Sequence, residues 1–275
     1  GTFVMERLLD RVAQELGLDR AEVRRRNLIA PGQMPYTTAL KTRNGRAVVL
    51  DGGDYPGCQE DALERAGWSD FSARQKAARA EGRYIGLGLA NFVKSTGRGP
   101  FESATVRIEP SGKIQVFTGA VEIGQGTKST LAQVVAAQLG GDPGNVNVTA
   151  GDTAAIALGM GAMNSRLAVM AGSSAHAAAT NVRAKALAAA GHMLEVAPSD
   201  LEIDGGMIHV VGAPDVCVSL GQVAGALAGT AGYLLPGGAG PGLEATEHVV
   251  IDDMTFGNGS AAVEVEVDIG TGAVE

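Results

Sequence analysis

The sequence is poor in cysteine, in aromatic residues and in positive charge. Its 275 residues include 2 cysteines, Cys58 and Cys217, which lie far apart and outside any CxxC pattern. We therefore expect free thiols in a reducing compartment, the cytoplasm, and neither a disulfide framework nor an iron–sulfur cluster on this chain. The formal net charge of −8 argues against a nucleic-acid partner, because a nucleic-acid surface needs a basic face.

Long apolar runs and recognisable catalytic sets are also missing. The longest weakly polar stretch, residues 167–194, is interrupted by polar and charged residues, among them Arg183 and Lys185. This pattern favours a helix buried in protein and predicts no membrane span. The 4 histidines show no metal-ligand spacing, and no GxSxG elbow occurs. We expect no catalytic side chain and no direct metal ligand here, so a cofactor or another chain would supply the reactive centre.

What the sequence does contain is glycine, at 40 residues, and a change of pattern near residue 83. Residues 1–82 read mostly as helix and loop, with 35–54 irregular and extended. In the strands that follow, 110-PSG-112 between two apolar runs predicts a hairpin, whose second strand covers 113–123. The fold class is α+β, with mixed sheets and packed helices. We expect a helical linking region over 1–82 and an α+β cofactor-binding region over 83–275, incomplete at both ends.

The stretch 121-VEIGQGTKSTLAQVVAAQLGG-141 places Gly124 and Gly126 between an apolar run and a strongly helical one. Backbone N–H groups at a helix N-terminus attract anions, so this turn and the hydroxyls after it are typical of a phosphate site. The other interpretation is a tight turn in which Thr127 or Ser129 is an ordinary N-cap. The stretch matches neither a Walker loop nor a full GxGxxG pattern.

A second glycine-rich loop, 151-GDTAAIALGMGAMNSRLAV-169, repeats the arrangement before a long alanine-rich helix. Asn164, Ser165 and Arg166 stand at the expected helix start, and capping by Ser165 with a solvated Arg166 is again the alternative. Two such helix starts in one chain predict a single extended anionic ligand held at two points. A third segment, 86-GLGLAN-91, lacks the acidic residue of a nicotinamide-binding fold and reads as a glycine-tolerant strand.

These loops resemble the molybdenum-binding subunit of the molybdenum hydroxylases, the family of xanthine dehydrogenase, aldehyde oxidoreductase, aerobic carbon monoxide dehydrogenase and bacterial N-heterocycle dehydrogenases. The resemblance rests on motifs that keep the family's order over nearly the whole chain: 5-MERLLDRVAQELGLDRAEVRRRNLI-29, 52-GGDY-55, 84-YIGLGLANFV-93, 122-EIGQGTKSTLAQVVAAQLG-140, 151-GDT-153, 159-GMGAMNSR-166 and 263-VEVEVDIGTGAV-274. It implies the molybdopterin-binding fold of the xanthine dehydrogenase type, and a chain that is a segment of the large subunit or a split subunit.

The resemblance also implies a cofactor and its contacts. The family binds molybdopterin, usually as the cytosine dinucleotide in bacteria, and the pterin dithiolene holds the molybdenum without direct protein ligands. The residues that match the family's cofactor-binding positions are Gly124, Gln125, Gly126, Thr127, Lys128, Ser129, Thr130, Asn164, Ser165 and Arg166. The 2Fe-2S clusters and FAD are expected on partner domains or subunits.

On the substrate side, the resemblance places Lys94, Ser95 and Asn164 along the pocket. The xanthine-type enzymes have a Phe-Thr pair where Lys94 and Ser95 stand, so this chain departs from the purine-oxidising pattern. Lys94 or Ser95 is expected to meet a polar or carboxylate-bearing substrate, and a lysine whose head reaches solvent is the other interpretation. The family's general-base glutamate is expected outside this chain.

The resemblance therefore implies part of the molybdopterin-binding catalytic subunit of a molybdenum hydroxylase. Such an enzyme oxidatively hydroxylates a carbon of an N-heterocycle or aldehyde with water as the oxygen source. The expected partners are the remaining part of the molybdenum subunit, an iron–sulfur subunit and an FAD subunit, and the chain alone is expected to be inactive. Two alternatives stay open: an inactive or cofactor-holding homologue without turnover, and a nicotinamide-dependent oxidoreductase.

Overall fold

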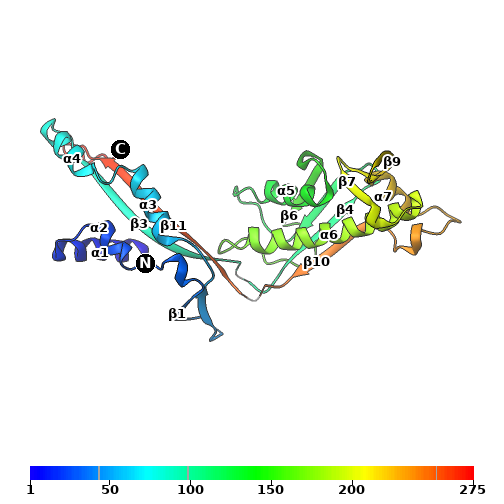
Figure 1. The fold of residues 1–275 in the computed structure, drawn as a ribbon, viewed down its shortest axis with the longest axis horizontal. Coiled ribbons are helices and arrows are strands. Elements are labelled where there is room, and N and C mark those ends of the chain that lie inside the picture. Colours follow the sequence, from blue (N-terminus) through cyan, green and yellow to red (C-terminus); the bar gives the residue numbers. More distant parts are fainter. Residues whose placement is uncertain (43, 98, 252) are drawn as a thin grey trace. The chain divides into compact units, whose positions relative to one another are not determined.

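The structure, a computed structural model, describes residues 1–42, 44–97, 99–251 and 253–275. It contains two compact units: unit 1 comprises Gly1–Ser95 and Thr255–Glu275, and unit 2 comprises Thr96–Met254. Helices and strands occur in both units (Figure 1), as the α+β class predicts. The extent of the cofactor-binding region expected from the sequence, 83–275, stays a prediction.

The N-terminal part of unit 1 is mostly helical. Its elements are α1 (Thr2–Leu16), α2 (Arg20–Arg25), α3 (Tyr55–Arg65), α4 (Phe71–Ala80) and the 3-10 turn η1 (Pro31–Gln33). Gly17 ends α1 in the left-handed conformation, and the Asp19 carboxylate caps α2 by accepting the N–H groups of Ala21 and Glu22, at 2.8 and 3.1 Å. Both signals act within a few residues, which is why they can be read from the sequence.

Unit 1 also contains two 2-stranded sheets. Residues 35–54, expected to be irregular and extended, include a regular antiparallel hairpin of β1 (Tyr36–Lys41) and β2 (Ala47–Leu50). Both strands are short and mostly exposed, so they lack the alternation of apolar and polar residues that announces a strand. The longer strand β3 (Ile85–Thr96) pairs with β11 (Thr255–Glu266) near the other end of the chain.

The centre of unit 2 is a 4-stranded sheet in the order β10-β4-β5-β6. Its strands are β4 (Glu102–Ile108), β5 (Ile114–Thr118), β6 (Val146–Ala150) and β10 (Leu243–Val249). β4 and β5 form the predicted hairpin, in which Gly112 has φ 82° and its N–H donates to the Glu109 carbonyl at 2.8 Å. β5 ends at Thr118, before the expected residue 123, because the chain turns at Gly119 and packs closely against another loop.

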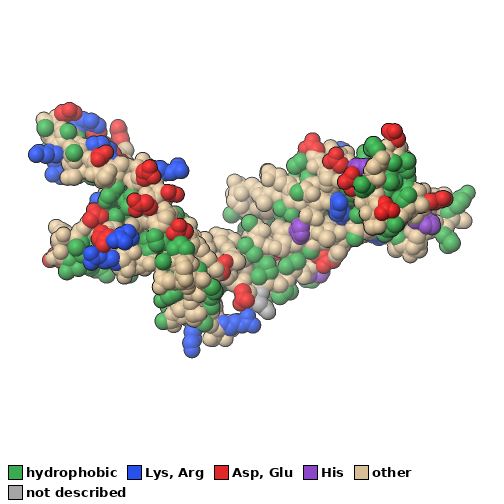
Figure 2. Space-filling model, viewed as in Figure 1, with side chains coloured by type: hydrophobic (Ala, Val, Ile, Leu, Met, Phe, Trp, Pro, Cys, Tyr) green, Lys and Arg blue, Asp and Glu red, His purple; other side chains and the backbone are tan. Residues whose placement is uncertain are grey.

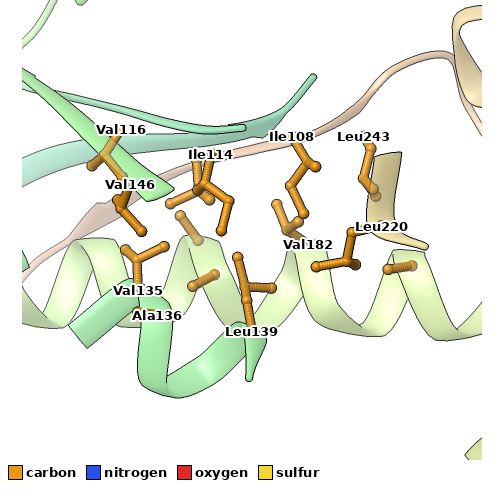
Figure 3. Close-up of a cluster of buried hydrophobic side chains, with 14 of the residues drawn as sticks. Ile108, Ile114, Val116, Val135, Ala136, Leu139, Val146, Val182, Leu220 and Leu243 are labelled. Carbon is orange, nitrogen blue, oxygen red and sulfur yellow. The ribbon is translucent and has the colours of Figure 1, made fainter. Parts of the chain in front are cut away.

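Helices α5 (Thr127–Leu139) and α6 (Leu167–Leu194) pack on this sheet and on each other. Figure 3 shows the core between them, in which Ile114, Val116 and Val146 of the sheet face apolar side chains of the helices. α6 contributes mainly alanines, whose small side chains let the sheet and α5 approach its backbone closely. The buried alanines of α6 are Ala171, Ala175, Ala178, Ala179, Ala186, Ala189 and Ala190.

The rest of unit 2 is an antiparallel 3-stranded sheet with one helix and several 3-10 turns. These elements are β7 (Leu201–Asp204), β8 (Met207–Val210), β9 (Ala213–Ser219), α7 (Leu220–Ala228), η2 (Pro143–Asn145), η3 (Pro198–Asp200) and η4 (Pro236–Gly238). A capping box begins α7: the Ser219 hydroxyl accepts the Gln222 N–H at 3.1 Å, and the Gln222 side chain accepts the Ser219 N–H at 2.8 Å.

Charge is distributed differently over the two units. Figure 2 shows side chains of both signs gathered over the helices of unit 1, and few over α5 and α6 of unit 2. The few charges on α5 and α6 agree with their apolar and small-residue sequences. Within the described ranges, no helix combines the length and the apolar character needed to cross a bilayer.

Candidate functional site

Helix α5 begins directly after the glycine turn that the sequence singled out. Gly124 (φ 100°) and Gly126 (φ 78°) lie in the left-handed region, which other residues adopt with strain, so the turn itself requires glycine. A Cβ atom on either residue would have no neighbour within 4 Å, so the outer side of the turn is open. Gly126 is the N-cap of α5, and the interpretation of Thr127 or Ser129 as the N-cap is therefore wrong.

The N–H groups of this turn do bind an anion, and that anion is the carboxylate of Glu122. Its Oε1 accepts the N–H groups of Gly124 (3.2 Å) and Gly126 (3.0 Å), and its Oε2 accepts the N–H of Lys128 (2.8 Å). The Lys128 N–H is the main cause that holds the pKa of Glu122 below its usual value, and the other two N–H groups add to the effect. Glu122 is therefore ionised at neutral pH and occupies donors that the sequence pattern assigns to a ligand.

Gln125, in the middle of the turn, folds its side chain over its own loop. Oε1 accepts the N–H of Ile123 at 2.7 Å, and Nε2 donates to the carbonyl of Val121 at 2.9 Å. A glutamine amide has two donor hydrogens and two acceptor lone pairs, so one of each is left for a ligand. Glu122 and Gln125 together hold the turn in one conformation before any ligand binds.

The second glycine-rich loop leads into α6 through two residues in an unusual conformation. Asn164 and Ser165 have φ values of 48° and 54°, in the left-handed region that residues other than glycine seldom adopt. α6 begins at Leu167 with Arg166 as its N-cap, so the interpretation of Ser165 as the N-cap is wrong. Backbone strain of this kind concentrates at functional sites, which makes this loop a candidate site.

Arg166 is buried beneath this loop. Its Nη1 lies 2.5 Å from Glu102 Oε2 and donates to the Gly161 carbonyl at 2.7 Å, and its Nη2 donates to the Phe101 carbonyl. Both side chains of the ion pair are 0% exposed. The interpretation of a solvated Arg166 is therefore wrong. Its position supports a role in holding the loop, and a direct contact with a cofactor stays a prediction.

Glu102 connects the two loops from the side of the sheet. Besides pairing with Arg166, it accepts the N–H of Met160 at 3.3 Å, and its carboxylate lies beside a close backbone contact between Gly119 and Gly159. A Cβ atom on Gly119 would lie 2.3 Å from the Cα atom of Gly159, so neither position has room for a side chain. Glu102 was not predicted as a site residue, because its one local signal is an acidic residue at the start of an apolar strand.

The two loops line a common pocket of about 350 Å³, a volume typical of small-molecule sites. Its lining residues are Ile123, Gln125, Thr127, Thr130, Leu131, Ala162, Met163, Asn164, Ser165, Arg166, Leu167 and Ala168. The pocket thus brings together most of the predicted cofactor contacts from both loops. Lys128 and Ser129 are not among its lining residues; they line a separate hollow of about 470 Å³ beside β6.

Thr127 gives this pocket a polar group in need of a partner. Its side chain is 5% exposed, and within the described part of the chain its hydroxyl has no hydrogen-bond partner. A buried polar group without a partner costs about 1–3 kcal/mol, so a small movement that brought a polar partner to this oxygen would be favourable. The pocket volume and the open side of the glycine turn leave space for a ligand beside both loops.

The predicted substrate contacts are distributed over both units. Lys94 and Ser95 lie in β3 and belong to unit 1, whereas Asn164 belongs to unit 2. Lys94 is exposed and its Nζ donates to the Ser95 carbonyl at 3.1 Å. The role of the three residues towards a substrate stays a prediction. Among the residues that the structure describes, no three His, Cys, Asp or Glu side chains group together as metal ligands.

The fold is that of a molybdopterin-binding domain. The model of the molybdopterin cofactor-binding domain family matches residues 61–275, and the chain belongs to this family. This result confirms the resemblance to the molybdopterin-binding subunits of the molybdenum hydroxylases.

Individual relatives show the same likeness. The chain is 35% identical over 271 residues to the 6-hydroxypseudooxynicotine dehydrogenase complex subunit gamma of Paenarthrobacter nicotinovorans. This alignment covers 98% of the chain and 34% of that protein. It is 32% identical over 290 residues to the carbon monoxide dehydrogenase large chain of Afipia carboxidovorans, covering 99% and 35%. The solved quinoline 2-oxidoreductase of Pseudomonas putida 86 superposes with a TM-score of 0.80 at 35% identity, covering 100% and 35%. The chain therefore spans about a third of the length of these relatives.

Proposed function

We propose that this chain forms the cofactor-binding wall of a molybdenum hydroxylase, in which the pocket between the two glycine-rich loops holds molybdopterin cytosine dinucleotide. The observation that carries the proposal is that both glycine-rich loops line one pocket. Thr127 is one of its lining residues, and its buried hydroxyl has no partner among the described residues. Membership of the molybdopterin-binding family supports a polar cofactor as the partner of this hydroxyl. The proposal does not require protein ligands for the metal, which the pterin dithiolene holds.

The residues of this chain bind and orient the cofactor. In the proposed complex the Thr127 hydroxyl and the remaining amide positions of Gln125 hydrogen-bond the cofactor, and Asn164 and Ser165 contact it from the second loop. Apolar neighbours such as Leu131 reduce the access of water to the bound group. When bound, the cofactor supplies the redox chemistry by which a substrate carbon is hydroxylated with oxygen from water. The general base is expected from a part of the enzyme outside this chain.

The chain spans about a third of the length of its relatives, so the other parts of the enzyme belong to the proposal as well. We infer that it works with the remaining part of the molybdenum subunit, an iron–sulfur subunit and an FAD subunit. One relative is named as the gamma subunit of a dehydrogenase complex and another as the large chain of a dehydrogenase, and these names support such an assembly. The quinoline 2-oxidoreductase is named for an N-heterocycle, which supports a substrate of that class.

The cofactor content of the protein, purified with its partners and without denaturation, tests this function. We expect molybdenum together with an equimolar amount of CMP after acid hydrolysis. Thr127→Val should retain about tenfold less of both, because one hydrogen bond to a buried group is worth about 1.4 kcal/mol. Thr180→Val is the matched control, since the Thr180 hydroxyl donates to the His176 carbonyl at 2.8 Å and Thr180 does not line the pocket. Neither molybdenum nor nucleotide in the folded complex would favour the inactive homologue instead.

The substrate side of the proposal concerns Lys94. We expect Lys94→Glu to raise KM about tenfold for substrates that carry a carboxylate and to leave KM for neutral substrates unchanged, because it reverses one charge beside the substrate. Steady-state kinetics of the complete enzyme with a neutral N-heterocycle and its carboxylated analogue measures the difference. Equal changes in KM for both substrates would show that the Lys94 ammonium group does not recognise the substrate carboxylate.

A further inference from the structure

The glycine turn before α5 differs from an ordinary anion site because it is already filled by its own chain. Glu122 accepts the N–H groups of Gly124, Gly126 and Lys128 at 2.8–3.2 Å. The N-cap, Gly126, has no side chain with which to cap the helix. The carboxylate therefore supplies the helix cap and, with the same bonds, takes the place of the anion that a helix N-terminus attracts.

The turn has two sets of hydrogen-bonding groups: one is bonded to Glu122, and the other belongs to residues that line the pocket. The three N–H groups bonded to Glu122 come from residues that do not line the 350 Å³ pocket. Gln125 and Thr127, which alternate with those residues along the chain, do line it. Thr127 is the first residue of α5, and its buried hydroxyl lacks a partner among the described residues. The groups left for a ligand are thus different from the ones that the sequence pattern indicates.

We propose that Glu122 is a positioning residue, whose carboxylate holds the turn so that Gln125 and Thr127 face the pocket. The same carboxylate excludes external phosphate from the amides of Gly124, Gly126 and Lys128. A phosphate carries between one and two negative charges at neutral pH and would have to share these donors with an ionised carboxylate, so the two anions exclude one another. The positioning role rests on the proposed function. The exclusion of phosphate depends on the geometry of the turn alone.

Anion binding to the complete chain tests the exclusion. Glu122→Ala removes the carboxylate and leaves three N–H groups with space for a small anion. We expect this variant to bind formate, the chemical group that it has lost, and inorganic phosphate at least tenfold more tightly than the parent chain. Glu122→Gln fills the same space with an amide and is expected to gain neither. Equilibrium dialysis against each labelled anion, at an ionic strength kept constant with chloride, measures all three proteins.

Cofactor retention with and without formate tests the positioning role. The purified Glu122→Ala enzyme should contain about tenfold less molybdenum and CMP than the parent enzyme. Formate added during purification should restore most of both. A loss caused by general destabilisation would not respond to formate. Glu109→Ala is the matched control: this carboxylate accepts the Ser111 hydroxyl at 3.3 Å and the Gln115 amide at 3.2 Å, and its removal should change neither readout.

Each outcome decides one part of the proposal. Phosphate binding by the parent chain as tight as by Glu122→Ala would overturn the exclusion, and full cofactor retention by both Glu122 variants would overturn the positioning role. If Glu122→Ala does not fold, Glu122→Ser, whose hydroxyl still provides a polar group, takes its place in both measurements. A parent enzyme without molybdenum would contradict the proposed function, whereas the dialysis result would still decide the exclusion.

Discussion

Replacing Arg166 with methionine is expected to destabilise the protein by about 3–5 kcal/mol, the usual result of leaving one charge of a buried ion pair without its partner. Each side chain of the pair is 0% exposed, so Glu102 would remain buried and would lose the positive charge that neutralises it. The loop at 159–166 would also lose the bond from Arg166 to the Gly161 carbonyl. We therefore expect the variant to lose its molybdenum and CMP as well as stability.

Urea unfolding of the two single variants and the double variant measures this prediction. Glu102→Leu combined with Arg166→Met should recover much of the stability, because replacing a whole buried pair with apolar residues is often neutral. It should not recover the cofactor, since the loop then lacks its polar anchor. Arg107→Met is the control, because the Arg107–Glu244 pair is 49% and 45% exposed and such pairs contribute about 0–1 kcal/mol. Similar losses from Arg166→Met and Arg107→Met would contradict the structure.

Gly119→Ala is expected to lower the free energy of unfolding by about 3 kcal/mol, in the upper range for added volume in a packed interior. The new Cβ atom would lie 2.3 Å from the Gly159 Cα atom and 2.8 Å from Glu102 Oε1. Backbone must move to make room, and the backbone that moves belongs to the loop which lines the pocket. The effect should therefore include a loss of bound molybdenum and CMP.

The control for this substitution is Gly172→Ala. Gly172 lies inside α6, and a Cβ atom there would have no neighbour within 4 Å. Because alanine favours a helix by about 1 kcal/mol over glycine, this variant should be slightly more stable than the parent. Thermal unfolding of both variants gives the comparison. A Gly119→Ala protein as stable as the parent would show that the two loops do not touch at Gly119 and Gly159.

Both predictions concern contacts that hold the two loops of the candidate site together. The Glu102–Arg166 pair and the contact between Gly119 and Gly159 join the segment after β5 to the loop before α6. Glu122 and Gln125 fix the glycine turn in the same way from within it. A pocket whose walls are held in this manner is pre-organised, so a ligand need not order the loops when it binds.

Local signals were enough to predict much of this protein from its sequence. Gly112 marks the hairpin between β4 and β5, because it acts through the backbone conformation of a turn of a few residues. The same holds for the two glycine-rich helix starts, whose order with the other motifs identified the family. The β1–β2 hairpin was missed, since its exposed strands carry no apolar alternation.

The tertiary structure decided how the two loops are used. It brought both loops to one pocket, gave the N–H groups of the glycine turn to Glu122 and placed Arg166 opposite Glu102, 64 residues away. The Glu122 contact is local, but it lies outside the N-cap positions that capping rules consider. The other contacts depend on which strand and which loop come to lie side by side. That arrangement results from packing the whole sheet against α5 and α6, and no pattern within a short segment contains it.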